Sequence, residues 1–523
     1  MLMDLLGGAT NVLAPQIFLL ITLGVAVGIV FGAVPGLTAV MAIALSLPMT
    51  YGLDPAAGIS LLVALFVGAT SGALISAILL KIPGTPSSVA TTFDGAPMME
   101  NGEGAKALGL GIVFSFFGTV LSIAALIFIA PWLATVALTF GPHEYFAIAI
   151  FSLTLIATLS TGSMVKGIFS GIAGFAISTV GIAPVEAIQR FTFDQVELNA
   201  GFSILTVLVG LFAIAEVIKV AEGARSISAE DMKAPSVGRI KGFGFSVPEG
   251  LSQIPNAIRS AFVGIGIGIL PGIGAGTSNI IAYVLAKKRS KTPEKFGTGH
   301  PEGVVASETA NNAGIGGAMI PLLTLGIPGD AVTAILLGGF MIHGIQPGPM
   351  LFITQGELVY TVFAALMLSA VMMLVLEFFG LRIFIRLLAV PKHILLPIIL
   401  VLCAVGAFGL SSRIFDIWTI LGFGVLGYAF VKAGIPAAPF IIGFVLGPMA
   451  ETNFRRGLQL SNGDALGFFT NPISGAFLTI AILSVAWQTV STIRASKRQR
   501  AVLAIEDELP KRQRPSAAQR AKP

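Results

Sequence analysis

One pattern of glycine and proline occurs twice in this chain, about half its length apart, inside segments apolar enough to lie in lipid. The two copies share their order of small residues: Gly28, Gly32, Pro35 and 82–84 (IPG), then Gly264, Gly268, Pro271 and 327–329 (IPG). Glycine and proline interrupt helices and leave backbone groups unpaired, which only protein or a wet cavity can satisfy in a bilayer. Matched breaks in two halves of a membrane protein indicate a transporter binding site.

The composition of the chain places these breaks in a membrane protein. Its 523 residues are 55% hydrophobic and only 11% charged, whereas soluble domains carry about a quarter charged residues. With about 20 residues per crossing, apolar stretches along the chain predict roughly 10–14 membrane segments. We therefore expect an all-α polytopic membrane protein with broken helices or re-entrant hairpins.

The repeated pattern divides the chain into two halves. Residues 1–221 form the first expected repeat and 251–493 the second, and the charged stretch 222–250 is a polar connector. A basic tail, 494–523, follows the last apolar span. By the positive-inside rule this tail predicts a cytoplasmic C-terminus.

Loop charge indicates that the two repeats are inverted. Lys287-Lys288-Arg289 ends the helix that follows Pro271, whereas the equivalent place in the first half, 51–55 (YGLDP), has no basic residue. Opposite charge at equivalent loops is what opposite membrane orientations produce. The prediction is two inverted repeats, with the Lys287 loop in the cytoplasm.

Polar residues interrupt the apolar background near both breaks of each half. Free N–H groups where a helix begins after a proline-glycine turn, with short hydroxyls beside them, suit a carboxylate. Unwound carbonyls with hydroxyl or amide side chains suit a hard cation. The residues expected to bind substrate are Gly84, Thr85, Ser87, Ser88, Asn311, Asn312, Gly329, Asp330 and Thr333. Those expected to bind the coupling ion are Pro35, Thr38, Pro271, Ser278 and Asn279.

A structural interpretation competes with each of these assignments. Serine and threonine also cap helices or bond to their own carbonyls. Lys81 is either a functional charge at bilayer depth or a side chain that reaches the interface. Glu216 lies near the end of an apolar helix, and we expect it to reach the interface. Three other acidic residues near expected helix ends should have topological or ion-pair roles: Glu144, Glu377 and Asp416.

The sequence offers no recognisable catalytic or cofactor motif. A Walker A lysine loop and a His-Glu-x-x-His motif are both missing, and the four histidines lack ligand spacing. We expect no enzyme activity, no catalytic residue, no resident metal or cofactor and no nucleic-acid partner. The expected partners of the apolar surface are lipids.

Several motifs resemble the large membrane subunit of tripartite tricarboxylate transporters, the TctA family. The resemblance covers nearly the whole chain up to the tail. It is carried by 32–38 (GAVPGLT), 81–88 (KIPGTPSS), 93–98 (FDGAPM), 191–193 (FTF), 201–216, 270–275 (LPGIGA), 307–313 (SETANNA), 326–330 (GIPGD) and 447–456 (GPMAETNFRR).

This resemblance implies a multi-pass permease of the bacterial inner membrane. It implies two protein partners, a small four-helix membrane subunit and a periplasmic binding protein that delivers a carboxylate such as citrate. It also implies transport driven by a gradient of Na⁺ or H⁺ rather than by ATP. Similarity to other binding-protein-dependent secondary transporters makes an elevator-like movement the expected mechanism.

Two other classes of function remain open from the residues alone. A passive channel or pore subunit for small organic anions would conduct without coupling to a gradient. An intramembrane enzyme would need a nucleophile and base, or a metal set, and no such set is recognisable. Saturable, coupled uptake separates a transporter from the first, and an intact transported substrate separates it from the second.

Overall fold

The structure, a computed structural model, is built almost entirely from helices. It describes residues 2–508 except 36, 160–162, 224–242, 272–273, 388–400 and 402–412. A single small sheet in this part of the chain pairs β1 (Gly181–Ile182) with β2 (Gln189–Arg190), antiparallel. Within the described residues, six helices are long and apolar enough to cross a membrane, and four shorter ones of 10–17 residues are also apolar. The predicted all-α polytopic class is confirmed.

The first half contains two broken-helix units in succession. Each unit is a helix, an irregular break and a second helix. In order, these elements are α1 (Leu2–Leu13), α2 (Pro15–Ala33), α3 (Ala39–Thr50), α4 (Pro55–Leu79), η1 (Pro86–Ser88), α5 (Thr91–Glu100) and α6 (Gly104–Ala137).

The second half has the same order of helices and breaks. Its elements are α11 (Val247–Ser252), α12 (Ile254–Ile269), α13 (Gly274–Arg289), η4 (Pro293–Lys295), α14 (Pro301–Leu325), α15 (Ala331–Ile342), α16 (Leu351–Thr354) and α17 (Gly356–Leu387). Thus α2, α3, α4, α5 and α6 correspond to α12, α13, α14, α15 and α17. The inverted orientation of the two halves stays a prediction.

The first break has the same local cause in both halves. The residue before each proline leaves the helix for extended geometry, at φ −81° and ψ 115° for Val34 and at φ −78° and ψ 119° for Leu270. Proline imposes this on its predecessor because its ring clashes with an α-helical residue before it. Pro35 and Pro271 therefore end α2 and α12.

Glycines bring the paired helices of each half into backbone contact. A Cβ atom added at Gly28 or Gly32 would strike the Leu65 or Ala69 carbonyl oxygen of α4. In the second half, Gly264 meets the carbonyl oxygen of Ala310 in α14 in the same way. Small residues allow such close packing between membrane helices. These glycines therefore give α2 and α12 bare faces toward α4 and α14.

The two halves also cross over one another through their longest helices. Helix α6 of the first half packs along α14 of the second, and α17 of the second packs along α4 of the first. Gly118 of α6 lies against the Thr309 carbonyl, and Gly316 of α14 lies against Ser122. The helices α4 and α14 are therefore buried at the centre of the fold.

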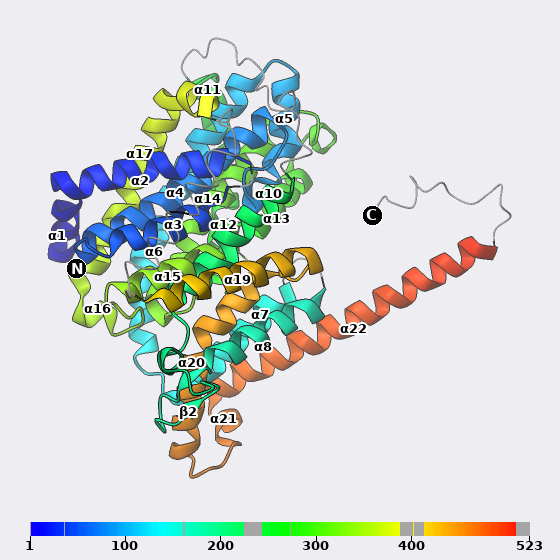
Figure 1. The fold of residues 1–523 in the computed structure, drawn as a ribbon. Helices are drawn as coiled ribbons and strands as arrows, with labels where there is room; N and C mark the ends of the chain where they lie inside the picture. Colours follow the sequence, from blue (N-terminus) through cyan, green and yellow to red (C-terminus); the bar gives the residue numbers. More distant parts are fainter. Residues whose placement is uncertain are drawn as a thin grey trace.

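A second group of helices forms a separate bundle below this body in Figure 1. It contains α7 (Pro142–Leu159), α8 (Met164–Ser178), α20 (Ala437–Leu460) and α22 (Pro472–Glu508), and α22 extends away from the rest of the molecule. The segments η2 (Val196–Ala200), α9 (Ile204–Leu208), the π-helical η3 (Val209–Ile214), α10 (Ala215–Gly223), α19 (Ile414–Ala433) and α21 (Gly467–Thr470) complete the described chain.

Part of the predicted domain plan falls outside the described residues. The connector 222–250 includes residues 224–242, and the tail 494–523 includes 509–523, neither of which the structure describes. Residues 494–508 of the tail continue α22 as helix.

The glycine contacts predict different effects for two nearby substitutions in α12. Gly264→Ala places a methyl group against the backbone of α14 and should lower stability by about 1–3 kcal/mol. Gly266→Ala, whose Cβ has no neighbour within 4 Å, should leave stability unchanged or slightly raised. Thermal unfolding of the detergent-solubilised variants measures this difference. Equal melting temperatures would contradict the packing role of Gly264.

Candidate functional site at the helix breaks

The second break of the first half, between α4 and α5, is held by a short hydroxyl network. The Ser88 hydroxyl donates to the Thr85 carbonyl at 3.0 Å and accepts from the Thr85 N–H at 3.4 Å. The hydroxyls of Thr85 and Ser87 lie 2.9 Å apart. Ser88 is fully buried, whereas Ser87 is half-buried. Ser87 therefore carries the hydroxyl closest to the surface.

The corresponding break of the second half has the same reciprocal geometry with an acidic residue. The Asp330 carboxylate accepts from the Thr333 N–H at 2.8 Å, and the Thr333 hydroxyl accepts from the Asp330 N–H at 2.8 Å. These contacts form a capping box at the start of α15. Because Asp330 already supplies negative charge there, this helix end differs electrostatically from the neutral one at Thr85.

Glycines let the chain at each second break pack against the C-terminal end of α2 or α12, the first helix of the same half's pair of breaks. A Cβ atom on Gly84 would strike the Gly32 carbonyl oxygen of α2. A Cβ atom on Gly329 would lie 2.8 Å from the Gly268 carbonyl oxygen of α12. In each half, both breaks therefore lie together, with Pro35 following Gly32 and Pro271 following Gly268.

Helix α13 connects the breaks of the two halves. Asn279 donates its side-chain amide to the Ser87 carbonyl of the first half. Gly276 packs beside Pro86, with 3.6 Å between its added Cβ and the Pro86 carbonyl oxygen. Gly274, at φ +65°, faces Asp330, with 3.1 Å between an added Cβ and the Asp330 Cβ. The first turns of α13 thus lie between the Ser87 segment and Asp330.

The predicted ion-binding residues occupy several kinds of position around these breaks. Thr38 caps α3 by accepting from the Met41 N–H at 3.2 Å. Ser278 is fully buried and donates to the Ala310 carbonyl at 3.3 Å. The Asn279 side-chain oxygen is buried and lacks a hydrogen-bond partner. Asn279 is therefore the predicted ion-binding side chain with an unused oxygen.

Two predicted substrate residues lie apart from the breaks, in the middle of α14. The Asn311 amide donates to the Thr70 carbonyl at 3.3 Å, and the Asn312 amide donates to the Ser115 hydroxyl at 2.8 Å. Both side chains are fully buried. The structure brings them together with Glu308 rather than with Thr85 or Asp330.

Two acidic residues were not among the predicted site residues although both are fully buried. Glu308 precedes Asn312 by one helical turn and hydrogen-bonds Thr91 and Ser115. The expectation for Glu377 is wrong, because it lies inside α17 and accepts from Ser71 at 2.9 Å. A carboxylate within an apolar stretch was the signal that could have identified it.

Three of the charged residues considered in the sequence analysis form ion pairs in the structure. Lys81 is exposed and pairs with Glu100 at 3.0 Å, consistent with the interface interpretation. Asp416 pairs with Arg413 at 3.0 Å, and Glu216 pairs with Lys219 at 3.1 Å. Glu144 instead accepts from the Gly141 N–H at 2.8 Å.

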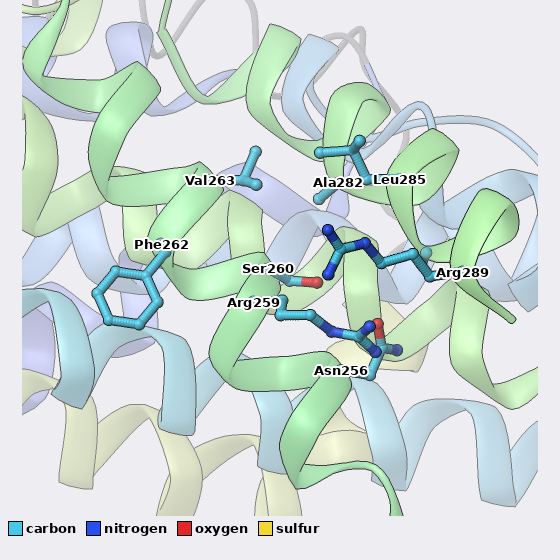
Figure 2. Close-up of a pocket in the computed structure, with 9 residues that line it drawn as sticks. Asn256, Arg259, Ser260, Phe262, Val263, Ala282, Leu285 and Arg289 are labelled. Carbon is cyan, nitrogen blue, oxygen red and sulfur yellow. The ribbon is translucent and has the colours of Figure 1, made fainter.

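A cavity of about 240 Å³ lies between α12 and α13, away from the breaks. Figure 2 shows Arg259 and Arg289 extending into the same space from these two helices. Apolar side chains form much of the remaining wall, including Val263 and Leu285. None of the predicted site residues lines this cavity, so we place the candidate site on the hydrogen-bonded breaks instead.

Comparison with known proteins agrees with the resemblance carried by the motifs. A family model described as the tripartite tricarboxylate transporter TctA family matches residues 18–442. An uncharacterized 52.8 kDa protein from the TAR-I ttuC' 3' region of Agrobacterium vitis is 34% identical over 500 residues, covering 95% of this chain and 98% of that protein. An uncharacterized protein from the TAR-II ttuC' 3' region of the same organism is 35% identical over 233 residues, covering 45% of this chain and 96% of the relative. The chain therefore belongs to the TctA family of tripartite tricarboxylate transporters.

Proposed function

We propose that this protein is the large permease subunit of a binding-protein-dependent secondary transporter for organic di- and tricarboxylates such as citrate. Membership of the TctA family supports a role as a membrane transporter subunit. Its partners would be a small four-helix membrane subunit and a periplasmic binding protein. The complex would work in the bacterial inner membrane, with the C-terminus of this chain in the cytoplasm.

The observation that carries this proposal is the position of α13 between two breaks from different halves. Asn279 binds the Ser87 carbonyl, and Gly274 lies against Asp330. Such an arrangement places hydroxyls, main-chain groups and an acidic side chain around one region of the protein interior. Transporters commonly place substrate sites where interrupted helices of two repeats meet.

The break at Thr85 and the break at Asp330 would act differently on a substrate carboxylate. The hydroxyls of Thr85 and Ser87 can donate to a substrate carboxylate, and Ser88 holds the Thr85 segment in place. Asp330 would repel a carboxylate, so it would favour an orientation of the substrate with a carboxylate at Thr85 and away from Asp330. Thr333 would fix Asp330, and Gly84 and Gly329 would permit the tight backbone paths.

One coupling ion, Na⁺ or H⁺, would bind close to the first breaks. Main-chain carbonyls near Pro35 and Pro271, the Thr38 and Ser278 hydroxyls and the Asn279 amide oxygen are the groups proposed for it. The unpartnered Asn279 oxygen supports this assignment because a buried acceptor without a donor is costly unless a ligand satisfies it.

An elevator movement is the proposed mechanism. The breaks lie together in the main body, and α7, α8, α20 and α22 form the separate bundle visible in Figure 1. The body would carry substrate and ion across the membrane while that bundle served as the scaffold. Relative motion of two groups of helices agrees with alternating access in repeat-built transporters.

Uptake of labelled citrate into proteoliposomes tests the proposed function. The vesicles would hold this chain and its small membrane partner, with or without the binding protein and with an imposed Na⁺ or H⁺ gradient. We expect saturable uptake of intact citrate that requires both the binding protein and a gradient. Uptake that needs neither would favour a passive channel, and absence of uptake for a panel of di- and tricarboxylates would contradict a carboxylate permease.

Substitutions at the two breaks test the proposed site. Thr85→Val keeps the side-chain shape but removes a hydroxyl, and Asp330→Ala removes the carboxylate. Thr85→Val should lower uptake by about tenfold or more, since a hydrogen bond to a charged group contributes about 1.5–3 kcal/mol. Asp330→Ala should also lower uptake, because it removes the charge that would set the orientation of the substrate. Initial uptake rates in the same proteoliposomes provide the measurement.

Asp54→Ala is the matched control, because Asp54 also caps a helix, α4, but is exposed. It should cost about 1 kcal/mol of stability and leave uptake near that of the unsubstituted protein. Wild-type uptake by both Thr85→Val and Asp330→Ala would remove these residues from the site. Equal loss in all three variants would indicate a general effect of helix capping.

A further inference from the structure

A cluster of buried polar side chains lies at the centre of the fold, where α4, α6, α14 and α17 meet. We call it the core acid cluster, and its members are Ser71, Ser115, Glu308, Asn311, Asn312 and Glu377. All six side chains are fully buried. Carboxylates in such surroundings are costly unless charge and hydrogen bonds compensate them.

Hydroxyl and amide groups surround the Glu308 carboxylate. One oxygen accepts from the Thr91 hydroxyl, and the other accepts from the Ser115 hydroxyl at 3.1 Å. The Asn312 amide lies 3.4 Å from the second oxygen and donates to Ser115 as well. All of these partners are neutral, so none of them supplies a positive charge that could compensate an ionised Glu308.

The Glu377 carboxylate is less well satisfied. Ser71 donates to one oxygen at 2.9 Å, while the other oxygen is buried and lacks a hydrogen-bond partner. Glu377 also lies within electrostatic reach of Glu308. Among the described side chains, no lysine, arginine or histidine forms an ion pair with either glutamate.

Two further oxygens of the cluster have no donor. The Asn311 and Asn312 amide nitrogens donate to Thr70 and Ser115, which leaves both side-chain oxygens buried without partners. Glu308, Asn311 and Asn312 occupy one face of α14, because they are spaced i, i+3 and i+4. Asn311 and Glu377 are bonded to the adjacent residues Thr70 and Ser71 of α4.

We propose that the core acid cluster binds a sodium ion that couples transport, in addition to the ion proposed near the first breaks, with Glu308 and Glu377 supplying its charge compensation. Hard cations prefer carboxylate and carbonyl oxygens. A cation would satisfy unpartnered oxygens of Asn311, Asn312 and Glu377 without needing a donor hydrogen for each. A proton on Glu377 could donate to one acceptor and would leave the other amide oxygen unsatisfied. The role of this sodium ion in coupling transport rests on the proposed function, whereas its binding at the cluster does not.

The position of the cluster provides a route for that coupling. Helix α4 leads to the break at Thr85, and α14 leads to the break at Asp330. Residues from both helices supply oxygens to the core acid cluster. Sodium between them would therefore fix the spacing of the helices that carry both halves of the candidate substrate site.

Equilibrium binding of ²²Na⁺ to the purified full-length protein in detergent tests the proposal without substrate or partner proteins. We expect saturable binding that excess unlabelled Na⁺ displaces and excess K⁺ does not. Glu308→Gln and Glu377→Gln keep side-chain shape but remove charge, and each should weaken binding at least tenfold. Glu144→Gln, which changes a buried carboxylate of α7 outside the cluster, should bind as the unsubstituted protein does.

A second variant separates loss of binding from loss of folding. Asn311→Ala removes one unpartnered oxygen without changing charge, and we expect several-fold weaker binding at an unchanged elution volume in size-exclusion chromatography. Absence of saturable binding in the unsubstituted protein, or unchanged binding in both glutamine variants and Asn311→Ala, would overturn the proposal. Sodium binding without carboxylate uptake would contradict the proposed function and leave this site standing.

Discussion

The close backbone packing of α2 on α4, and of α12 on α14, is the constraint on which the rest of the structure depends. Lipid cannot pair the backbone groups that a broken helix exposes, so protein must surround every break. Gly28 and Gly264 let each pair of helices approach to backbone contact. Gly84 and Gly329 then return the chain to the ends of α2 and α12, so that the breaks of each half are enclosed by their own partner helices.

The similarity of the halves makes their chemical differences informative. Both second breaks use the same reciprocal side-chain geometry, but one is built with Thr85 and Ser88 and the other with Asp330 and Thr333. Likewise, the polar face of α14 has no equivalent in α4, where Ser71 instead reaches toward Glu377. The common backbone plan thus supports two unlike electrostatic environments, as the proposed site for an anion and a cation would require.

The sequence predicts the breaks well because glycine and proline act locally. Proline determines the conformation of the residue before it, and the four-residue glycine spacing defines one helix face. The contact of Asn279 with Ser87 could not be predicted, since it depends on how the halves pack together. For the same reason Glu377 was misplaced near a helix end: only the length of α17 and its packing on α4 show that this carboxylate is internal.

The first turn of α13 limits how anion recognition could change among related proteins. At Gly274 and Gly276 the wall facing Asp330 and Pro86 is bare main chain. A peptide group offers the same donors and acceptors whatever residues surround it, and a larger residue at Gly274 would be strained at its positive φ. Related proteins with this turn would therefore keep a generic surface for small anions. Discrimination among similar anions would then have to evolve in other side chains or in the protein that delivers them.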